Sequence, residues 1–333
     1  MKKLLFLLLF AAAGLQGWAT DLYLVGDATP ADWELSWLSP TKMTEVSTDV
    51  YEWTGVLFTG TGEGFKILTQ ADWNPAIHPS TGGLTIDTAG SDVAALPYSN
   101  GTDSKWTVSE TAIYKITVTF RTSDVLVECE KVSDAIVDGY LQVSSADLLL
   151  NYTRKIVKGR INNNNACNIA LTQDIDLSSC NPWTPIGTDG TKFTKTFDGQ
   201  GHKIENMTVD GSKDQQGFFG VLGAGAVIKN LIIDSSCTIS SSGGATLAAF
   251  AAVCNNSGEI KFENCGNEAN VTGQKQNNAG FLGCNYGGST TLVFNNCYNK
   301  GTISGGWEVL VPPPGIVPSS LASLASLPMK ADS

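Results

Sequence analysis

The chain has 333 residues, of which 16% are charged, and its formal net charge is −11. An acidic chain with few Arg lacks the clustered positive charge that nucleic acids and anionic membranes require, so neither is expected as a partner. The 35 glycines, with abundant Asn, Ser and Thr, favour many short strands and tight turns over long helices. We therefore expect an all-β protein.

Residues 1–19 are predicted to be a signal peptide. Lys2 and Lys3 begin it, and residues 4–13 form its apolar stretch. Gly17 and Ala19 are small residues at the two positions that a signal peptidase inspects. The apolar run is shorter than the ~20 residues of a membrane span, and no second long run follows. We expect export to the periplasm or the outer-membrane surface, with no transmembrane segment.

Residues 20–132 contain short alternating runs of apolar and polar side chains, which Gly, Pro and Asp separate. Strands at this spacing predict an immunoglobulin-like β-sandwich. The predicted strands include residues 22–25, 50–53, 64–68, 113–118 and 125–128.

Five of the eight tryptophans fall in this region, at positions 33, 37, 53, 73 and 106. A Trp ring offers a flat face to the C–H face of a sugar, but it can equally fill a core. Trp53 alternates with Tyr51 in a predicted strand, so we expect Trp53 in the core. Trp37 and Trp73 lie among Pro, Asp and Asn, which favours loops, where binding residues are common.

The region resembles the starch-binding domains of SusE and SusF type. The resemblance rests on three blocks, at residues 22–28 with Trp33, at residues 51–53, and at residues 64–67 with Trp73. It implies that Trp33, Lys66 and Trp73 meet the sugar, and we assign Asn100 as the remaining polar contact. The predicted glycan-binding residues are Trp33, Trp37, Lys66, Trp73 and Asn100.

Residues 133–160 are predicted to be a linker and a capping helix. Leu148, Leu149, Tyr152 and Ile156 recur at helical spacing behind Ser145, and Gly159 follows as a stop signal. A lone amphipathic helix before a repetitive region is typical of an N-terminal cap, which covers the open end of a solenoid.

Residues 161–306 repeat at intervals of 24 to 32 residues, which indicates one coil of a parallel β-helix per repeat. The hexapeptides beginning at Ile204 and Ile228 match each other. Residues one coil apart should then lie above one another. The predicted interior rows are Phe219, Phe250 and Phe281, then Ile239, Val271 and Ile303, then the amide pair Asn267 and Asn299.

The eight cysteines have two possible states. Cys265 and Cys297 lie one repeat apart, and Cys254 and Cys284 nearly so. Such residues can form a buried column of free thiols, or a disulfide across neighbouring coils, because strand spacing matches the reach of a disulfide. With no C-x-x-C pair and only two His, a zinc site is not expected.

The second half resembles the GLUG-motif β-helix proteins that Bacteroidetes export. The matching blocks lie at residues 169–177, 183–187, 197–204 and 217–220, with Asn-Cys-x-Asn blocks at 264–267 and 296–299. The resemblance implies a right-handed parallel β-helix at the cell surface or in the periplasm, usually without assigned catalysis.

No catalytic site, metal or cofactor is predicted. Arg occurs only at positions 121, 154 and 160, outside the repeats, although a lyase commonly uses Arg or Lys as its base. Asp189, Asp198 and Asp210 each adjoin Gly, which is typical of turn residues. His202 could act as a base, but the sequence shows no fixed acid beside it.

These patterns favour an exported, non-catalytic glycan-binding protein for an α-glucan or a host or dietary polysaccharide or glycoconjugate, with the β-helix as a rigid spacer or second contact surface. The alternatives are a surface adhesin or structural protein that binds through the β-helix, with possible cell-surface protein partners, and a degenerate polysaccharide-cleaving enzyme. Residues 307–333 form an irregular tail that resembles neither a coil nor a cap, and we expect a truncation or a flexible segment there.

Overall fold

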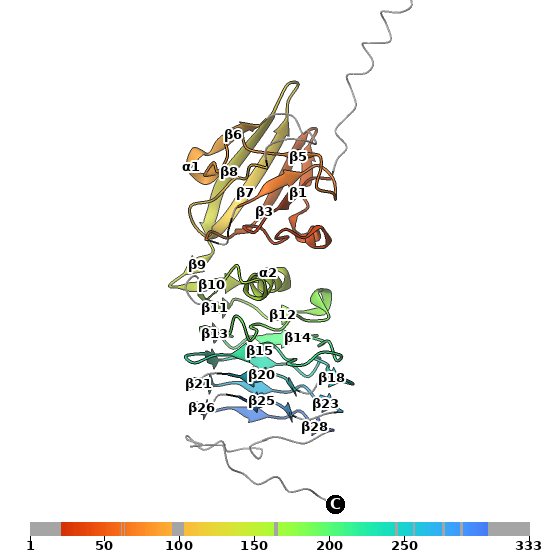
Figure 1. The fold of residues 1–333 in the computed structure, drawn as a ribbon, viewed down its shortest axis with the longest axis vertical. Helices are drawn as coiled ribbons and strands as arrows, with labels where there is room; N and C mark the ends of the chain where they lie inside the picture. The colour runs from red at the N-terminus through yellow and green to blue at the C-terminus, as the bar shows by residue number, and fades with distance from the viewer. Residues whose placement is uncertain are drawn as a thin grey trace, which may run out of the picture. The chain divides into compact units, whose positions relative to one another are not determined.

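The computed structural model describes residues 21–60, 62, 64–94, 103–162, 166–243, 246–255, 257–274, 277–286 and 289–305. Two compact units meet at the peptide between Ala135 and Ile136 (Figure 1). The predicted signal peptide, Asn100 and the predicted tail lie outside the described residues. None of the helices in the described ranges is long and apolar enough to span a membrane.

The N-terminal unit consists of two antiparallel sheets (Figure 1). The larger sheet has the order β2-β3-β7-β8-β6, and the smaller one has the order β1-β4-β5. Their bounds are β1 Tyr23–Val25, β2 Thr44–Ser47, β3 Val50–Leu57, β4 Lys66–Leu68, β5 Ala76–Ile77, β6 Ser91–Ala94, β7 Ala112–Phe120 and β8 Val125–Asp134. Short helices η1 (Leu35–Trp37), η2 (Ser39–Thr41) and α1 (Ile86–Ala89) lie in the connections.

Side chains from both sheets share one hydrophobic core, so the sheets form the predicted sandwich. Leu24 of β1 and Ile67 of β4 belong to the same buried cluster as Ile116 of β7. Strand β7 alternates strictly between buried and half-buried side chains, which is the pattern of a strand with one face on a core. Trp53 is buried in this core, as predicted, and its indole N–H donates to the carbonyl of Pro40 over 2.9 Å.

The C-terminal unit is a β-solenoid built from parallel strands, as predicted (Figure 1). Successive coils add strands to the sheets β10-β11-β13-β16-β21-β26, β12-β14-β17-β22-β27, β15-β20-β25, β18-β23-β28 and β19-β24. The hairpin strand β9 pairs antiparallel with β10 at the start of the first sheet.

The strands of the first two sheets are β9 Ile136–Val137, β10 Tyr140–Val143, β11 Asn168–Leu171, β13 Thr196–Asp198, β16 Val227–Lys229, β21 Gly258–Glu263, β26 Thr290–Asn295, β12 Ile175–Asp176, β14 Lys203–Glu205, β17 Ile232–Ile233, β22 Gly266–Asn267 and β27 Tyr298–Asn299. The others are β15 Phe219–Leu222, β20 Ala251–Cys254, β25 Leu282–Asn285, β18 Ile239–Ser241, β23 Val271–Gly273, β28 Ile303–Ser304, β19 Leu247–Ala248 and β24 Asn278–Ala279. A short helix, η3, covers Ser178–Cys180.

Helix α2 (Ala146–Val157) forms where the sequence predicts a helix. The Ser145 side chain accepts the backbone N–H of Leu148, which caps the first turn. Gly159 follows the helix with a φ of 70°, a conformation that glycine adopts without strain. The Tyr152 hydroxyl donates to the carbonyl of Cys167 over 3.0 Å, so the helix is fastened to the segment that enters β11.

The coil register corrects one predicted row and one predicted repeat match. Phe250 stacks on Phe281 with ring centroids 4.7 Å apart, but Phe219 lies opposite Ala251, so Phe218 is the residue that shares their row. The second correction concerns the matching hexapeptides, because Ile204 pairs with Ile233 whereas Ile228 pairs with Phe197. The two hexapeptides have similar residues, but they lie in strands of different sheets, β14 and β16, and do not stack on each other.

Amide ladders follow the solenoid at two bends. Asn267 donates to Asn299 over 2.7 Å, as predicted. A second ladder was not predicted, and in it Asn296 donates to Asn264 over 2.9 Å and Asn264 donates to Asn230 over 3.0 Å. These three residues have φ between 51° and 54°, in the left-handed region that Asn tolerates better than other non-Gly residues.

The cysteines within the described residues are free thiols. Cys265 and Cys297 lie on adjacent coils, where the N–H of Tyr298 donates to the carbonyl of Cys265. Cys254 stands opposite Asn285 rather than Cys284, so that predicted pair is out of register by one residue. Burial raises the pKa of Cys254 to about 12, which keeps this thiol protonated and unreactive near neutral pH.

Candidate binding site on the N-terminal unit

The candidate site lies on the outer face of the small sheet β1-β4-β5. Side chains alternate along β4, so Ile67 enters the main core while Leu68 joins a separate cluster on the other side of the sheet. Trp33 and Leu35, from the segment after β1, pack against this second cluster. Lys66 lies two residues from Leu68 and therefore belongs to the same outer face.

Two tryptophan rings flank the ammonium group of Lys66. Its Nζ lies 6.0 Å from the centroid of Trp33 and 5.8 Å from that of Trp73. The Lys66 side chain is only 10% exposed, whereas Trp73 is 37% exposed and Trp33 is half-buried. The arrangement therefore combines a fixed cation with aromatic surface that remains open to a ligand.

The two tryptophans are held by the same local device. In each case the residue before the tryptophan is an aspartate whose carboxylate accepts the tryptophan's own backbone N–H, over 2.7 Å at Asp32 and 2.7 Å at Asp72. Trp73 lies in the loop between β4 and β5, and the Thr69 N–H and hydroxyl close this loop on the carbonyl of Pro75. Both rings thus extend from tethered turns rather than from open loops.

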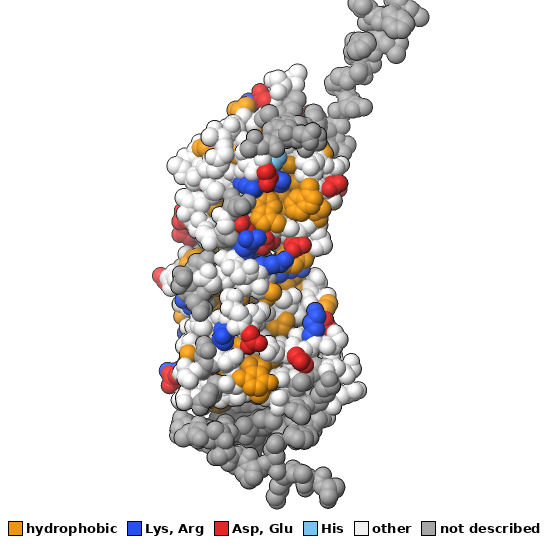
Figure 2. All heavy atoms as spheres, in the orientation of Figure 1, with side chains coloured by type: hydrophobic (Ala, Val, Ile, Leu, Met, Phe, Trp, Pro, Cys, Tyr) orange, Lys and Arg blue, Asp and Glu red, His pale blue; other side chains and the backbone are white. Residues whose placement is uncertain are grey.

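Asp103 and Lys105 complete the polar part of the site. The Asp103 carboxylate accepts from Lys66 over 2.9 Å and lies 3.0 Å from the Nζ of Lys105, and this second ammonium is 5.4 Å from the Trp33 centroid. The backbones of Phe65 and Trp106 bond to each other in both directions, which places the segment before Trp106 beside Lys66. Figure 2 shows exposed hydrophobic side chains next to Lys, Asp or Glu side chains on the visible face of this unit.

The neighbouring ammonium groups keep Asp103 in its ionised, carboxylate form. Burial raises the pKa of Asp103, but the hydrogen bonds from Lys66 and Lys105 outweigh that effect and hold the pKa below its ordinary value. His78 adds a neighbour, because its Nδ1 lies 3.0 Å from the carbonyl of Ser104. The site therefore offers ammonium donors, a carboxylate acceptor and aromatic faces, a set that suits a neutral molecule rich in hydroxyl groups.

We expect Asp103→Asn to weaken ligand binding about two- to fivefold, because Lys66 would lose its charged partner and its fixed position. In the wild type the Lys66–Asp103 pair is complete above the ordinary carboxyl pKa of 3.8 and is lost as the pH falls through the lowered pKa. Binding should thus stay constant from about pH 5 to 8. Titration calorimetry at several pH values checks this, and a variant with wild-type affinity at neutral pH would contradict it.

The structure brings three of the five predicted site residues together, namely Trp33, Lys66 and Trp73. Trp37 ends η1 and is half-buried, and the two rings at 6.0 Å and 5.8 Å from the Lys66 ammonium are those of Trp33 and Trp73. Asn100 lies outside the described residues. Asp103 and Lys105 were missed because their approach to Lys66 depends on the pairing of Phe65 with Trp106 across 41 positions, and no local pattern signals it.

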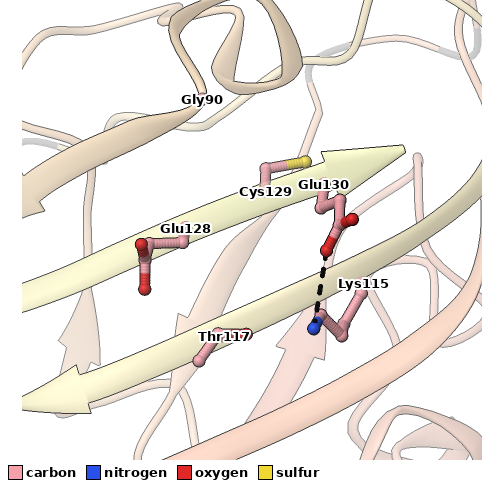
Figure 3. A pocket seen from close by; sticks show the side chains of 6 residues that line it. All are labelled: Gly90, Lys115, Thr117, Glu128, Cys129 and Glu130. Carbon is pink, nitrogen blue, oxygen red and sulfur yellow. Dashed lines mark ion pairs between the residues drawn. The ribbon is translucent and has the colours of Figure 1, made fainter. Parts of the chain in front are cut away.

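A second hollow lies on the outer face of the larger sheet, with a volume of about 210 Å³ (Figure 3). It is lined by Gly90, Lys115, Thr117, Glu128, Cys129 and Glu130. Lys115 lies 3.5 Å from Glu130 and 3.8 Å from Glu52, so its charge is already matched. Without an aromatic face among its lining residues, the hollow is the weaker candidate for a sugar.

The structure corrects the interpretation of His202. Its Nδ1 lies 3.1 Å from the carboxylate of Asp174, so this histidine does have an acid beside it. The same carboxylate accepts the backbone N–H of Lys203 over 3.0 Å, so Asp174 also stabilises the turn that leads into β14. Over the ranges that the structure describes, no group of three or more His, Cys, Asp and Glu side chains could hold a metal ion.

The sequence of residues 21–126 matches the family described as SusF/SusE starch specific CBMs. Residues 21–126 are a SusF/SusE-type domain. The match covers both sheets of the sandwich up to the first part of β8, and with them Trp33, Lys66 and Trp73. This family match indicates a carbohydrate-binding unit. Comparisons of the chain with curated proteins and with solved structures gave no match.

Proposed function

We propose that the protein is an exported, non-catalytic glycan-binding protein, and that its N-terminal unit binds an α-glucan at Trp33, Lys66 and Trp73. The observation that carries this proposal is the position of the Lys66 ammonium, 6.0 Å from one tryptophan ring and 5.8 Å from the other. A pyranose can lie with its C–H face on a ring while its hydroxyl groups accept from the ammonium and donate to Asp103.

An α-linked glucan is the preferred ligand for two reasons. The family that matches residues 21–126 is described as starch specific. An α-glucan chain is curved, and two separate aromatic faces with a donor between them can follow a curved chain. The acidic balance of the whole chain, with a net charge of −11, further favours a neutral polymer over an anionic one.

The remaining parts of the chain have proposed roles that follow from their sequence. Residues 1–19 would direct export to the periplasm or the outer-membrane surface. Residues 20–132 would bind the glycan, residues 133–160 would link and cap, and the β-helix of residues 161–306 would act as a rigid spacer or second contact surface. The GLUG-type resemblance supports this placement of a non-catalytic β-helix.

Affinity electrophoresis of the full chain tests the proposal, with gels that contain starch, pullulan, dextran or mucin glycans. We expect starch and pullulan to retard the protein and dextran to do so less. Lys66→Met should remove most of the retardation, because the side chain keeps its length but loses the donor. Lys261→Met, on the solenoid, is the matched control and should migrate as wild type. Retardation by none of the polymers would favour an adhesin that binds through the β-helix.

A further inference from the structure

One side of the solenoid carries an exposed aromatic ring in a row of polar side chains. Tyr286, which follows β25, is 59% exposed, the highest value among the large hydrophobic side chains recorded as exposed. Its interaction with the Cys284 side chain raises the pKa of the Tyr286 hydroxyl above its ordinary value. At this exposure, ring surface of Tyr286 is open to solvent.

Tyr286 lies in register with Asn255 of the preceding coil, and Asn255 connects it to two further polar side chains. The Tyr286 backbone N–H donates to the carbonyl of Cys254, which places Asn255 beside it on the preceding coil. The Asn255 side chain donates to the carboxylate of Asp189 over 3.4 Å, and Gln215 donates to the other oxygen of that carboxylate over 3.0 Å. The row Tyr286, Asn255, Gln215 and Asp189 is called here the solenoid row.

Asp189 holds its position because its turn is fixed. The N–H of Thr188 donates to the carbonyl of Thr191 over 2.9 Å, and the N–H of Thr191 donates back to the Thr188 hydroxyl over 3.1 Å. Asp189 thereby reaches from its own coil across to side chains of later coils. Its carboxylate therefore contacts Asn255, which lies one coil, about 4.8 Å, from Tyr286.

The chemistry of the solenoid row selects a hydroxyl-rich, uncharged ligand. A carboxylate and two amides offer acceptors and donors to neighbouring hydroxyl groups, and an exposed ring offers an apolar face for a sugar. Asp189 places negative charge in the row, which disfavours an anionic polymer.

We propose that the solenoid row is a second binding site for a neutral glycan chain, with Tyr286 as its platform and Asp189 as its polar anchor. The site needs no residue of the N-terminal unit. Its existence therefore does not depend on the α-glucan site around Lys66, and the two can be tested separately in one chain.

The test uses the full-length chain with both Trp33→Ala and Trp73→Ala, which removes the aromatic faces of the first site. Affinity electrophoresis and titration calorimetry are run with starch, pullulan, dextran, xylan, mannan and β-glucan. In this background we expect at least one polymer to bind, Tyr286→Ala to weaken its binding at least about fivefold, and Tyr286→Phe to preserve it. Asp189→Asn should weaken binding as well, because a neutral amide oxygen accepts hydrogen bonds from sugar hydroxyl groups less strongly than a charged carboxylate oxygen does.

Matched controls separate loss of the site from loss of the fold. Tyr298→Ala removes a tyrosine from β27, where Lys300 lies 4.7 Å from its ring centroid, and Asp210→Asn changes a turn aspartate that binds Ser212. Both should bind as the parent does, and melting temperatures should show Tyr286→Ala folded. The proposal is overturned if the double-Trp chain binds none of the polymers, or if folded Tyr286→Ala binds as well as Tyr298→Ala.

Discussion

Replacing Trp73 with Ala should weaken α-glucan binding by at least about tenfold, because the sugar loses one of the two aromatic faces beside Lys66. Trp73 is 37% exposed and its loop is closed by Thr69, so the substitution removes ring surface without opening the core. The free energy of unfolding should change by less than about 0.5 kcal/mol. Titration calorimetry with maltoheptaose and a urea titration measure the two quantities.

Trp37→Ala is the matched control for this prediction. Trp37 is a half-buried tryptophan of the same unit at the end of η1, whereas the two rings beside the Lys66 ammonium are those of Trp33 and Trp73. Its loss should leave the affinity within about twofold of wild type. Equal losses in the two variants would mean that the ligand lies elsewhere or that both substitutions act through stability.

Replacing Phe250 with Ala should destabilise the solenoid by about 3–5 kcal/mol. Phe250 is fully buried, stacks on Phe281 with centroids 4.7 Å apart, and meets Phe262 edge to face with centroids 6.0 Å apart. The cavity would lie inside a stack where neighbouring coils cannot collapse without breaking their parallel register. Urea unfolding followed by far-ultraviolet circular dichroism checks the loss.

Phe250→Leu serves as the graded comparison, since it keeps most of the apolar volume and should cost clearly less than Phe250→Ala. Retention of α-glucan binding by both variants would show that the N-terminal unit folds even when the solenoid is destabilised. We expect this because the chain divides into two compact units between Ala135 and Ile136. A loss below about 1 kcal/mol for Phe250→Ala would contradict the interior position of the ring.

The sequence was sufficient to locate the strands and the helix whose apolar side chains recur at a regular local spacing. Alternation located β3, β7 and β8, and the spacing of Leu149, Tyr152 and Ile156 located α2, because each pattern reflects a face buried against a core. The row of Ile239, Val271 and Ile303 is confirmed by the strand pairing, since all three occupy the same place in their coils.

The sequence could not predict the register between strands, or which residues far apart in the chain come into contact. Phe218 and Phe219 are adjacent aromatic residues, and only the backbone pairing shows which of them lies in line with Phe250. The partner of Lys66 depends likewise on the isolated bridge between Phe65 and Trp106, so Asp103 carried no signal of its own in a segment rich in Ser, Thr and Asp. His202 and Asp174 lie 28 positions apart and meet through stacking of their coils.

The contact of Asp103 with both Lys66 and Lys105 has a consequence for how the site should respond to ionic strength. Two ammonium groups alone would attract any polyanion, and their attraction would fade steeply with added salt. With the Asp103 carboxylate 2.9 Å from one and 3.0 Å from the other, half of that charge is already neutralised within the protein. A ligand held mainly by ring faces and hydroxyl groups should then bind almost equally well in dilute buffer and in seawater.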